Sequence, residues 1–351
     1  EQGYVLAENA LGEMYFDGLG CEKNDQEALY WVQKAERESE DPDIAMTLAM
    51  IFKDSEDATV RDPGKAFTYV KKAVDAGRET ALNLLGTFYE SGTGVPQDLK
   101  KAFECYSLAA EEGVEMAYLN VGSCYQFGYG TEQDFVKAAA YFKLGADAGN
   151  RYCLNALAMC YKNGQGVEQN YKKAFELFQE SAYAGNNAAQ FNVGLAYEEG
   201  SGVAQDFEEA KKWYLLSAEN GFGKAMAALG VYAEHGIPDR EPDLEEAFDW
   251  YLKSANVGDY GDTQWLIGNC RTYGLMNSYI DEKEGFEWYL KAAYNGHATS
   301  QNNVAIEYVK GILVEQDYEQ AVVWFEKAVA QEDPYALDNY GVMLMHGTGV
   351  K

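Results

Sequence analysis

The sequence predicts an all-α protein, a right-handed α-solenoid (superhelix) of antiparallel helix pairs with about nine complete repeats and a partial tenth. Three observations predict this fold. A small residue recurs every 36 to 38 positions, an Asn or Asp follows it in each complete repeat, and large aromatic residues follow that. A period this short indicates that the 351 residues form one array of repeats and not two or three globular domains.

The first helix of each repeat, helix A, is marked by a Gly or Ala that we call the register residue. Five residues earlier another small residue stands in nine of ten repeats, and three residues later an aromatic recurs in seven. These offsets place all three positions on one face of a helix. A glycine inside a helix costs about 0.8–1 kcal/mol relative to alanine, so its recurrence indicates close packing against another helix. The register residues are Gly12, Ala49, Gly86, Gly122, Ala158, Gly194, Gly230, Gly268, Ala305 and Gly341.

A loop and the start of a second helix, helix B, come next. The loop begins with Gly in nine of ten repeats, as expected where a chain leaves a helix with positive φ. An Asn or Asp then precedes helix B as an expected N-cap, and in five repeats a Glu or Gln three residues later predicts a capping box. The expected caps are Asn24, Asp62, Asp98, Asp134, Asn170, Asp206, Asp243, Asp281 and Asp317.

Helix B carries large residues, as at Trp213 and Tyr214, then a small residue, and in seven repeats a closing Gly in the expected left-handed C-cap, Gly258 among them. We expect these aromatic side chains to pack on the small residues of helix A, and neighbouring pairs to stack. The prediction is a single array over residues 1–351. Its repeats are expected at about 4–40, 41–77, 78–113, 114–149, 150–185, 186–221, 222–258, 259–296, 297–333 and, in part, 334–351.

The recurring pattern, Ala-x4-Gly-x2-Tyr-x2-Gly-x-Gly-Val-x2-Asp-x3-Ala-x3-Tyr-x2-Ala-x3-Gly, is clearest in residues 81–113 and 189–221. It resembles the Sel-1-like repeat, a relative of the tetratricopeptide repeat, over essentially the whole chain. The resemblance implies an adaptor, because related proteins scaffold membrane-associated degradation complexes, activate partner enzymes, or mediate signalling and host contact in bacteria. A cysteine-rich branch of the family joins each helix pair by a disulfide. This chain departs from that branch, since Cys153 has Ser181 and Ala182 at the partner positions.

Charge and composition narrow the function. The chain has 57 Asp and Glu against 28 Lys and Arg, a formal net charge of -29, which disfavours nucleic acid and favours a basic partner. No apolar run approaches the roughly 18 residues that span a bilayer, so we expect no direct membrane insertion. Scattered cysteines, three histidines and glycine loops that follow helices indicate no metal site, no cofactor and no catalytic site.

We therefore expect a non-catalytic scaffold or adaptor that binds a protein or peptide through the concave helix A surface, the loop edge, or both. The alternative is a recognition or regulatory arm of a longer multidomain enzyme or signalling protein. The partial tenth repeat stops before its helix B, so we expect the natural protein to be longer. Cysteine usage favours a cytoplasmic location, with an exported or periplasmic one if a leader was removed.

Two groups of residues, and one tryptophan, are candidates for partner contact. Helix A lines the concave wall of related superhelices, where an Asn amide can both donate to and accept from an extended peptide; bonding between helices is the alternative. Four asparagines stand two residues before a register residue: Asn120, Asn192, Asn303 and Asn339. Trp265 is a further candidate, because it alone among six tryptophans lies outside the common helix B position.

The second group lies in the loops of repeats seven to nine, where apolar residues replace Thr, Gly or Gln. An exposed apolar edge is typical of a protein contact, and packing beneath their own loops is the alternative for these side chains. The residues are Leu275, Met276, Tyr279, Ile280, Ile312 and Leu313.

Overall fold

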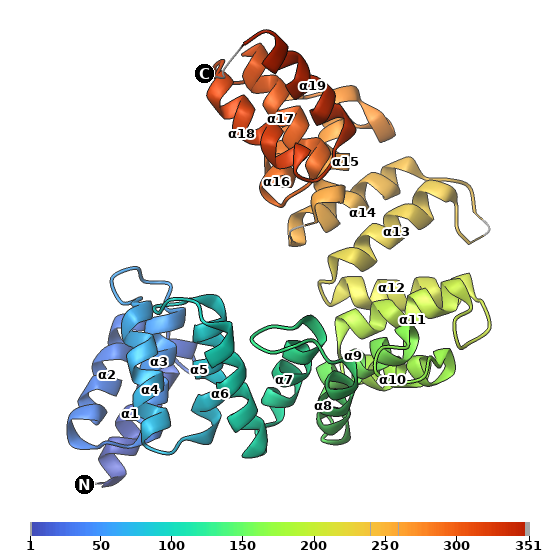
Figure 1. Ribbon diagram of the computed structural model, residues 1–351. Helices are drawn as coiled ribbons and strands as arrows, with labels where there is room; N and C mark the ends of the chain where they lie inside the picture. Colours follow the sequence, from blue (N-terminus) through green and yellow to red (C-terminus); the bar gives the residue numbers. More distant parts are fainter. Residues whose placement is uncertain (1, 239, 259, 348–351) are drawn as a thin grey trace. The chain divides into compact units, whose positions relative to one another are not determined.

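The computed structural model describes residues 2–238, 240–258 and 260–347. These residues form nineteen α-helices and one short 3-10 helix, η1 (Leu275–Asn277), with no β-strand among them (Figure 1). Odd-numbered helices are A helices and even-numbered ones are B helices. Residue contacts divide the chain into two compact units, 1–177 and 178–351, and the division falls within α10.

The helix bounds follow the predicted repeats. The A helices are α1 (Gln2–Asp17), α3 (Pro42–Asp54), α5 (Glu79–Ser91), α7 (Glu115–Phe127), α9 (Arg151–Asn163), α11 (Asn187–Glu199), α13 (Gly223–His235), α15 (Gly261–Tyr273), α17 (Ala298–Lys310) and α19 (Pro334–Met345). The B helices are α2 (Asp25–Glu38), α4 (Pro63–Asp75), α6 (Leu99–Glu111), α8 (Phe135–Asp147), α10 (Tyr171–Tyr183), α12 (Phe207–Glu219), α14 (Leu244–Val257), α16 (Glu282–Tyr294) and α18 (Tyr318–Val329). The fold is thus the predicted α-solenoid, with nine helix pairs and one further A helix in the described residues.

All nine predicted N-caps are confirmed. Each side chain accepts a hydrogen bond from the backbone N–H three residues on, at 2.9–3.0 Å. The predicted capping box is wrong in its second half. The backbone N–H of the cap donates instead to a helix A carbonyl three residues past the register residue, as from Asp98 to Tyr89 at 2.9 Å. The same residue therefore starts helix B and ties it to helix A.

Five register glycines lie directly beneath helix B aromatic rings, as predicted: Gly86, Gly122, Gly194, Gly230 and Gly268. Gly12 lies beneath Val32 instead, and nothing lies within 4 Å of a Cβ added to Gly341. A Cβ added to Gly194 would lie 2.7 Å from the Tyr214 ring, and one added to Gly230 would lie 2.6 Å from the Tyr251 ring. Tyr214 is 1% exposed, so the ring fills the space that the missing side chain leaves. This repeated contact sets the spacing of the two helices in the five pairs that have it.

In repeats three to five the loop packs on the repeat before it. The second glycine of a Gly-x-Gly loop packs on the first residue of the preceding helix B: a Cβ on Gly94, Gly130 or Gly166 would overlap the carbonyl oxygen of Pro63, Leu99 or Phe135. At the far end of helix B, one prediction is wrong. Gly258 is extended (φ -178°) rather than left-handed, because α14 continues one residue further than most B helices.

Candidate functional site

Two of the four predicted asparagines bond to an asparagine of the preceding A helix. Asn120 Nδ2 donates to Asn83 Oδ1 at 2.8 Å, and Asn339 Nδ2 donates to Asn302 Oδ1 at 3.0 Å. These bonds match the alternative given above for the asparagines, which is hydrogen bonding between helices. Each amide still has a second N–H and its own carbonyl oxygen, and all four predicted asparagines are partly exposed.

Trp265 lies in α15 and packs partly buried against the hydrophobic cluster of the last repeats. Its ring is tilted over His297, with 5.4 Å between ring centroids. The indole N–H is buried and has no hydrogen-bond partner among the described residues. Trp265 therefore belongs to the contact between repeats eight and nine.

The loop of repeat eight is held by a buried arginine. Arg271 replaces the aromatic residue found three positions after most register residues, and its Nε lies 3.1 Å from Glu284 Oε2. Its guanidinium carbon lies 3.8 Å from the ring centroid of Tyr279, whose hydroxyl donates to Glu284 at 2.8 Å. Burial raises the pKa of Glu284, but the hydrogen bonds from Tyr279 and Arg271 outweigh it and hold that pKa below its usual value.

The predicted apolar residues of this loop divide into two kinds. Met276 packs against the core cluster that contains Phe248, as in the alternative of packing beneath its own loop. Its φ of 52° is unusual for a residue other than glycine. Leu275, Tyr279 and Ile280 remain 46%, 61% and 64% exposed. This part of the edge is open to solvent.

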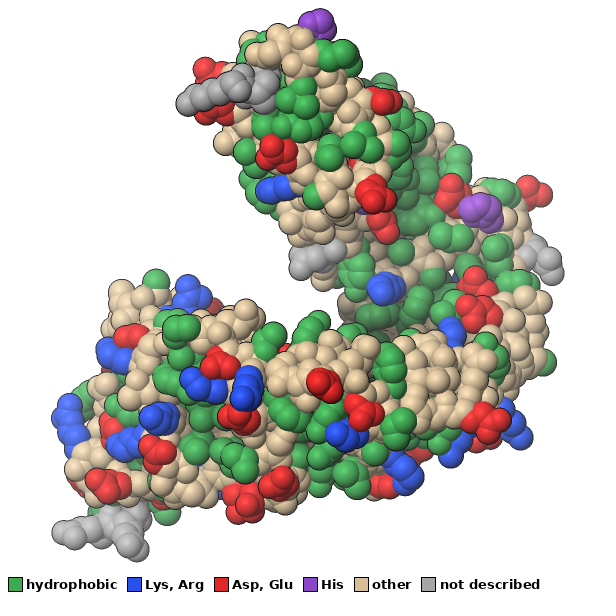
Figure 2. Space-filling view, in the orientation of Figure 1, with side chains coloured by type: hydrophobic (Ala, Val, Ile, Leu, Met, Phe, Trp, Pro, Cys, Tyr) green, Lys and Arg blue, Asp and Glu red, His purple; other side chains and the backbone are tan. Residues whose placement is uncertain are grey.

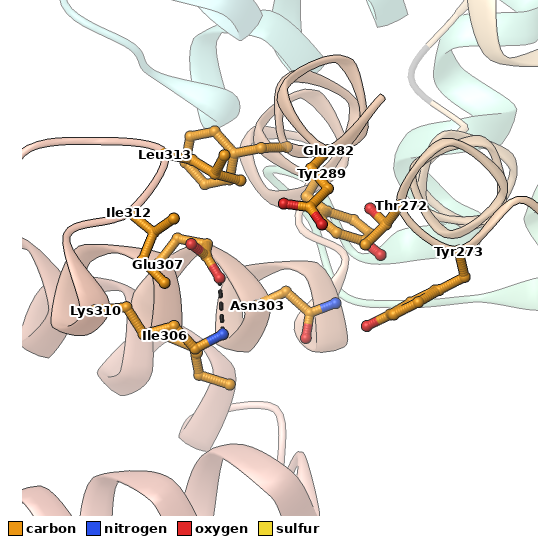
Figure 3. A pocket seen from close by; sticks show the side chains of 11 residues that line it. Thr272, Tyr273, Glu282, Tyr289, Asn303, Ile306, Glu307, Lys310, Ile312 and Leu313 are labelled. Carbon is orange, nitrogen blue, oxygen red and sulfur yellow. Dashed lines mark hydrogen bonds and ion pairs between the residues drawn. The ribbon is translucent and has the colours of Figure 1, made fainter. Parts of the chain in front are cut away.

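Three of the predicted residues, Asn303, Ile312 and Leu313, line one pocket of about 310 Å³ in repeats eight and nine, which we call the Asn303 pocket. Figure 3 shows Asn303 and Tyr273 projecting from α17 and α15 toward the same space, with Ile312 and Leu313 entering from the loop after α17. The lining is Thr272, Tyr273, Glu282, Phe286, Tyr289, Asn303, Ile306, Glu307, Lys310, Ile312 and Leu313. One predicted amide and two predicted loop residues thus share a site.

A change in the loop accounts for the opening. Leu313 stands two residues after Gly311, where repeats three to five have the second loop glycine that rests on the preceding helix B. Glu282, the first residue of α16, occupies the position that this glycine would contact. A leucine side chain does not fit between a loop and a helix end that are in direct contact, and here both Leu313 and Glu282 line the pocket.

Beside the pocket, α16 also departs from the other B helices. Gly285 replaces an alanine that the other eight B helices share, and a Cβ there would overlap Thr272 Oγ1. Tyr289 is 6% exposed, and its hydroxyl donates to Asn269 Oδ1 at 2.7 Å. Burial raises the pKa of Tyr289 to about 12, so this phenol stays neutral at physiological pH.

The charge at the pocket is acidic. Lys310 Nζ pairs with Glu307 Oε1 at 2.9 Å, while Glu282 is exposed at the start of α16. Over the repeats nearest the C-terminus, the visible face in Figure 2 carries acidic side chains and few basic ones. Exposed carboxylates beside apolar side chains favour a ligand that is both basic and apolar.

The described residues contain no group of three or more His, Cys, Asp and Glu side chains placed to hold a metal ion. None of their helices is long and apolar enough to cross a membrane. The six cysteines are free thiols, and Cys124, Cys160 and Cys270 are buried two residues after their register residues.

Comparison with known proteins places the repeats in a family. The Sel1 repeat matches ten segments, residues 5–39, 48–77, 80–114, 115–150, 151–186, 187–222, 223–259, 261–297, 298–333 and 334–351. A search of curated proteins gave no match.

Many solved structures are similar, and three of them illustrate the likeness. The chain is 30% identical to c5321, a protective antigen of uropathogenic Escherichia coli strains with an SLR fold, over 100% of this chain and 74% of that one, with a TM-score of 0.60. It is 28% identical to a Sel1 repeat protein from Oxalobacter formigenes over 89% of this chain and 90% of that one, also at 0.60. Yeast Tom70, at 13% identity, covers 98% of this chain and 96% of its own at 0.51, a likeness of fold alone. Since the repeat matches extend over most of its residues, the chain belongs to the Sel1 repeat family.

Proposed function

We propose that this chain is a non-catalytic scaffold that binds a segment of a partner protein in the Asn303 pocket. One observation carries the proposal: an amide from helix A and two apolar loop residues, predicted separately as contact residues, line the same open pocket. Its volume of about 310 Å³ is enough for one or two side chains of a partner.

The lining suits a protein ligand. Ile312 is 71% exposed at the rim, and Tyr289 and Phe286 provide a buried aromatic floor. The Asn303 amide has both donor and acceptor atoms, which match the backbone of a peptide. An apolar floor, an exposed apolar residue at the rim and an amide are together the elements of a small interaction site.

The titratable groups support binding rather than catalysis. Burial raises the pKa of the Cys105 and Cys160 thiols to about 11 and that of Tyr69 to about 12. These shifts hold thiols and phenols in their protonated forms, which is the opposite of nucleophile activation.

A pair of matched variants tests the proposal. Ile312 follows the first loop glycine of repeat nine, and Leu19 follows the first loop glycine of repeat one with similar exposure, 60%. Immobilised chain should capture partner proteins from an extract of its source cells, measured by quantitative mass spectrometry. We expect Ile312→Asp to lose a set of partners that Leu19→Asp retains, with both melting temperatures close to that of the parent chain. Equal capture by the two variants would refute the proposal.

A further inference from the structure

A second pocket repeats the first on the other side of α17. This Asn339 pocket, of about 370 Å³, is formed by α17, α18 and α19. Its residues stand one repeat after those of the Asn303 pocket: Asn339 corresponds to Asn303, Phe325 to Tyr289, and Val342 to Ile306. The two cavities are therefore one design used twice in succession.

The two pockets adjoin. Ile306 and Lys310 of α17 line both of them. The bond from Asn339 to Asn302, 3.0 Å long, holds α19 directly against α17. Because packed helices lie about 8–10 Å apart, the centres of the pockets are separated by about 10 Å.

Their chemistry differs at two corresponding positions. Glu282 and Glu307 line the Asn303 pocket, whereas Tyr318 and Met343 take their places in the Asn339 pocket, which has no carboxylate in its lining. A Lys or Arg side chain suits the first pocket, because its aliphatic stem can cover the Tyr289 and Phe286 floor while its charge meets Glu282. A large apolar side chain suits the second.

We propose that α15 to α19 bind an extended peptide segment with a basic side chain in the Asn303 pocket and a large apolar side chain in the Asn339 pocket. An extended chain in the polyproline II conformation rises about 3.1 Å per residue with three residues per turn, so two side chains three residues apart lie on the same face, about 9 Å apart. The Asn303 and Asn339 amides, one at each pocket, bond to the peptide backbone between and beside them. This inference rests on the proposed function and specifies its ligand.

Selection from a random peptide library displayed on phage, against the immobilised chain, provides the probe. We expect the enriched peptides to share a Lys or Arg and a large apolar residue about three positions apart. A synthetic peptide from this set, measured by fluorescence anisotropy, should bind Glu282→Lys about tenfold more weakly than the parent chain. Replacing its basic residue by Glu should restore binding to Glu282→Lys. Val342→Asp should also weaken binding about tenfold, since Val342 is 49% exposed at the second pocket and its replacement leaves the core intact.

The failures of the two proposals are distinguishable. Peptides that respond to Ile312→Asp but not to Val342→Asp would overturn the two-pocket inference and leave the proposed function standing. Enriched peptides with acidic anchors, or a charge swap that gives no restoration, would overturn the assignment of the basic side chain. Binding unaffected by Ile312→Asp, Glu282→Lys and Val342→Asp alike would contradict both.

Discussion

The hydroxyl of Tyr214 on α12 donates a hydrogen bond to Glu198 Oε2 on α11, at 2.6 Å, above the register residue Gly194. The same pair recurs as Tyr106 with Glu90 and Tyr251 with Glu234, each at 2.7 Å. Where helix B has phenylalanine at this position, the sequence has no glutamate at the matching helix A position: the pairs are Phe142 with Gln126, Phe178 with Lys162 and Phe325 with Val309. The carboxylate is thus present only in repeats whose tyrosine can donate to it.

We expect Tyr214→Phe to destabilise α11 and α12 by about 1–2 kcal/mol, because it removes a hydrogen bond to a charged group that is partly buried. Glu198 would keep only the longer bond from Tyr232, at 3.2 Å. Hydrogen exchange of the amides in α11 and α12 measures the change in the free energy of opening. The double variant Tyr214→Phe with Glu198→Gln recreates the pair of repeat four and should recover most of the loss. No recovery would show that the hydroxyl acts independently of the carboxylate.

A second prediction separates helix propensity from packing at the register position. Alanine is favoured over glycine in a helix by about 1 kcal/mol, yet Gly194→Ala should destabilise by about 1–3 kcal/mol because its Cβ would lie 2.7 Å from the Tyr214 ring. Gly341 is the matched control, since nothing lies within 4 Å of a Cβ added there. Gly341→Ala should be neutral or stabilising. Urea unfolding measures the change in the free energy of unfolding for both variants. A Gly194→Ala variant that is more stable than the parent chain would contradict the packing argument.

The contact between repeats eight and nine should weaken in acid. His297 caps α17, with Nδ1 accepting the Ser300 N–H at 3.1 Å, and burial lowers its pKa from 6.5 against the raising effect of Asp262 and Asp333. A lowered pKa means that stability is complete above about pH 6.5 and is lost as pH falls through the folded value. Trp265, stacked on the ring, reports the change by fluorescence.

The variant His297→Asn keeps a capping side chain that does not titrate in this range. We expect the urea midpoint seen by Trp265 fluorescence to fall between pH 7.5 and pH 5 in the parent chain and to stay constant in the variant. A variant that is as sensitive to pH as the parent would assign the effect to other groups.

The fold was predictable because its signals repeat. A single Asp or Gly is a weak indicator of helix bounds. Nine caps and ten register residues in phase, however, indicate one arrangement of helices, and the structure confirms that arrangement. The backbone bond from each cap to helix A was missed, since it depends on how two helices meet and not on residue type. A glutamine four residues before the register residue was also overlooked. Gln190, Gln264 and Gln301 occupy this position, and each donates to the end of the preceding B helix.

The candidate site was predictable only in pieces. The sequence indicated Asn303 because of its position on helix A, and Ile312 because it lies in an apolar loop. Nothing in the sequence indicated that the two residues line the same pocket. Their meeting depends on how far the loop of repeat nine stands from α16. That distance follows from a missing glycine, whose significance appears only when Gly94 and Gly130 are seen in contact with the preceding helix.

The loss of that glycine gives the last prediction. Leu313→Gly restores the Gly-x-Gly loop of repeats three to five, so the loop should settle on the start of α16 and close the Asn303 pocket. Leu313→Ala removes nearly the same side chain but keeps a Cβ, which at Gly94, Gly130 or Gly166 would overlap a helix carbonyl. We therefore expect Leu313→Gly to lose the partners captured by the parent chain, and Leu313→Ala to retain a substantial part of them. Equal losses would mean that Leu313 acts by contact with the ligand alone, because only the approach of the loop distinguishes the two variants.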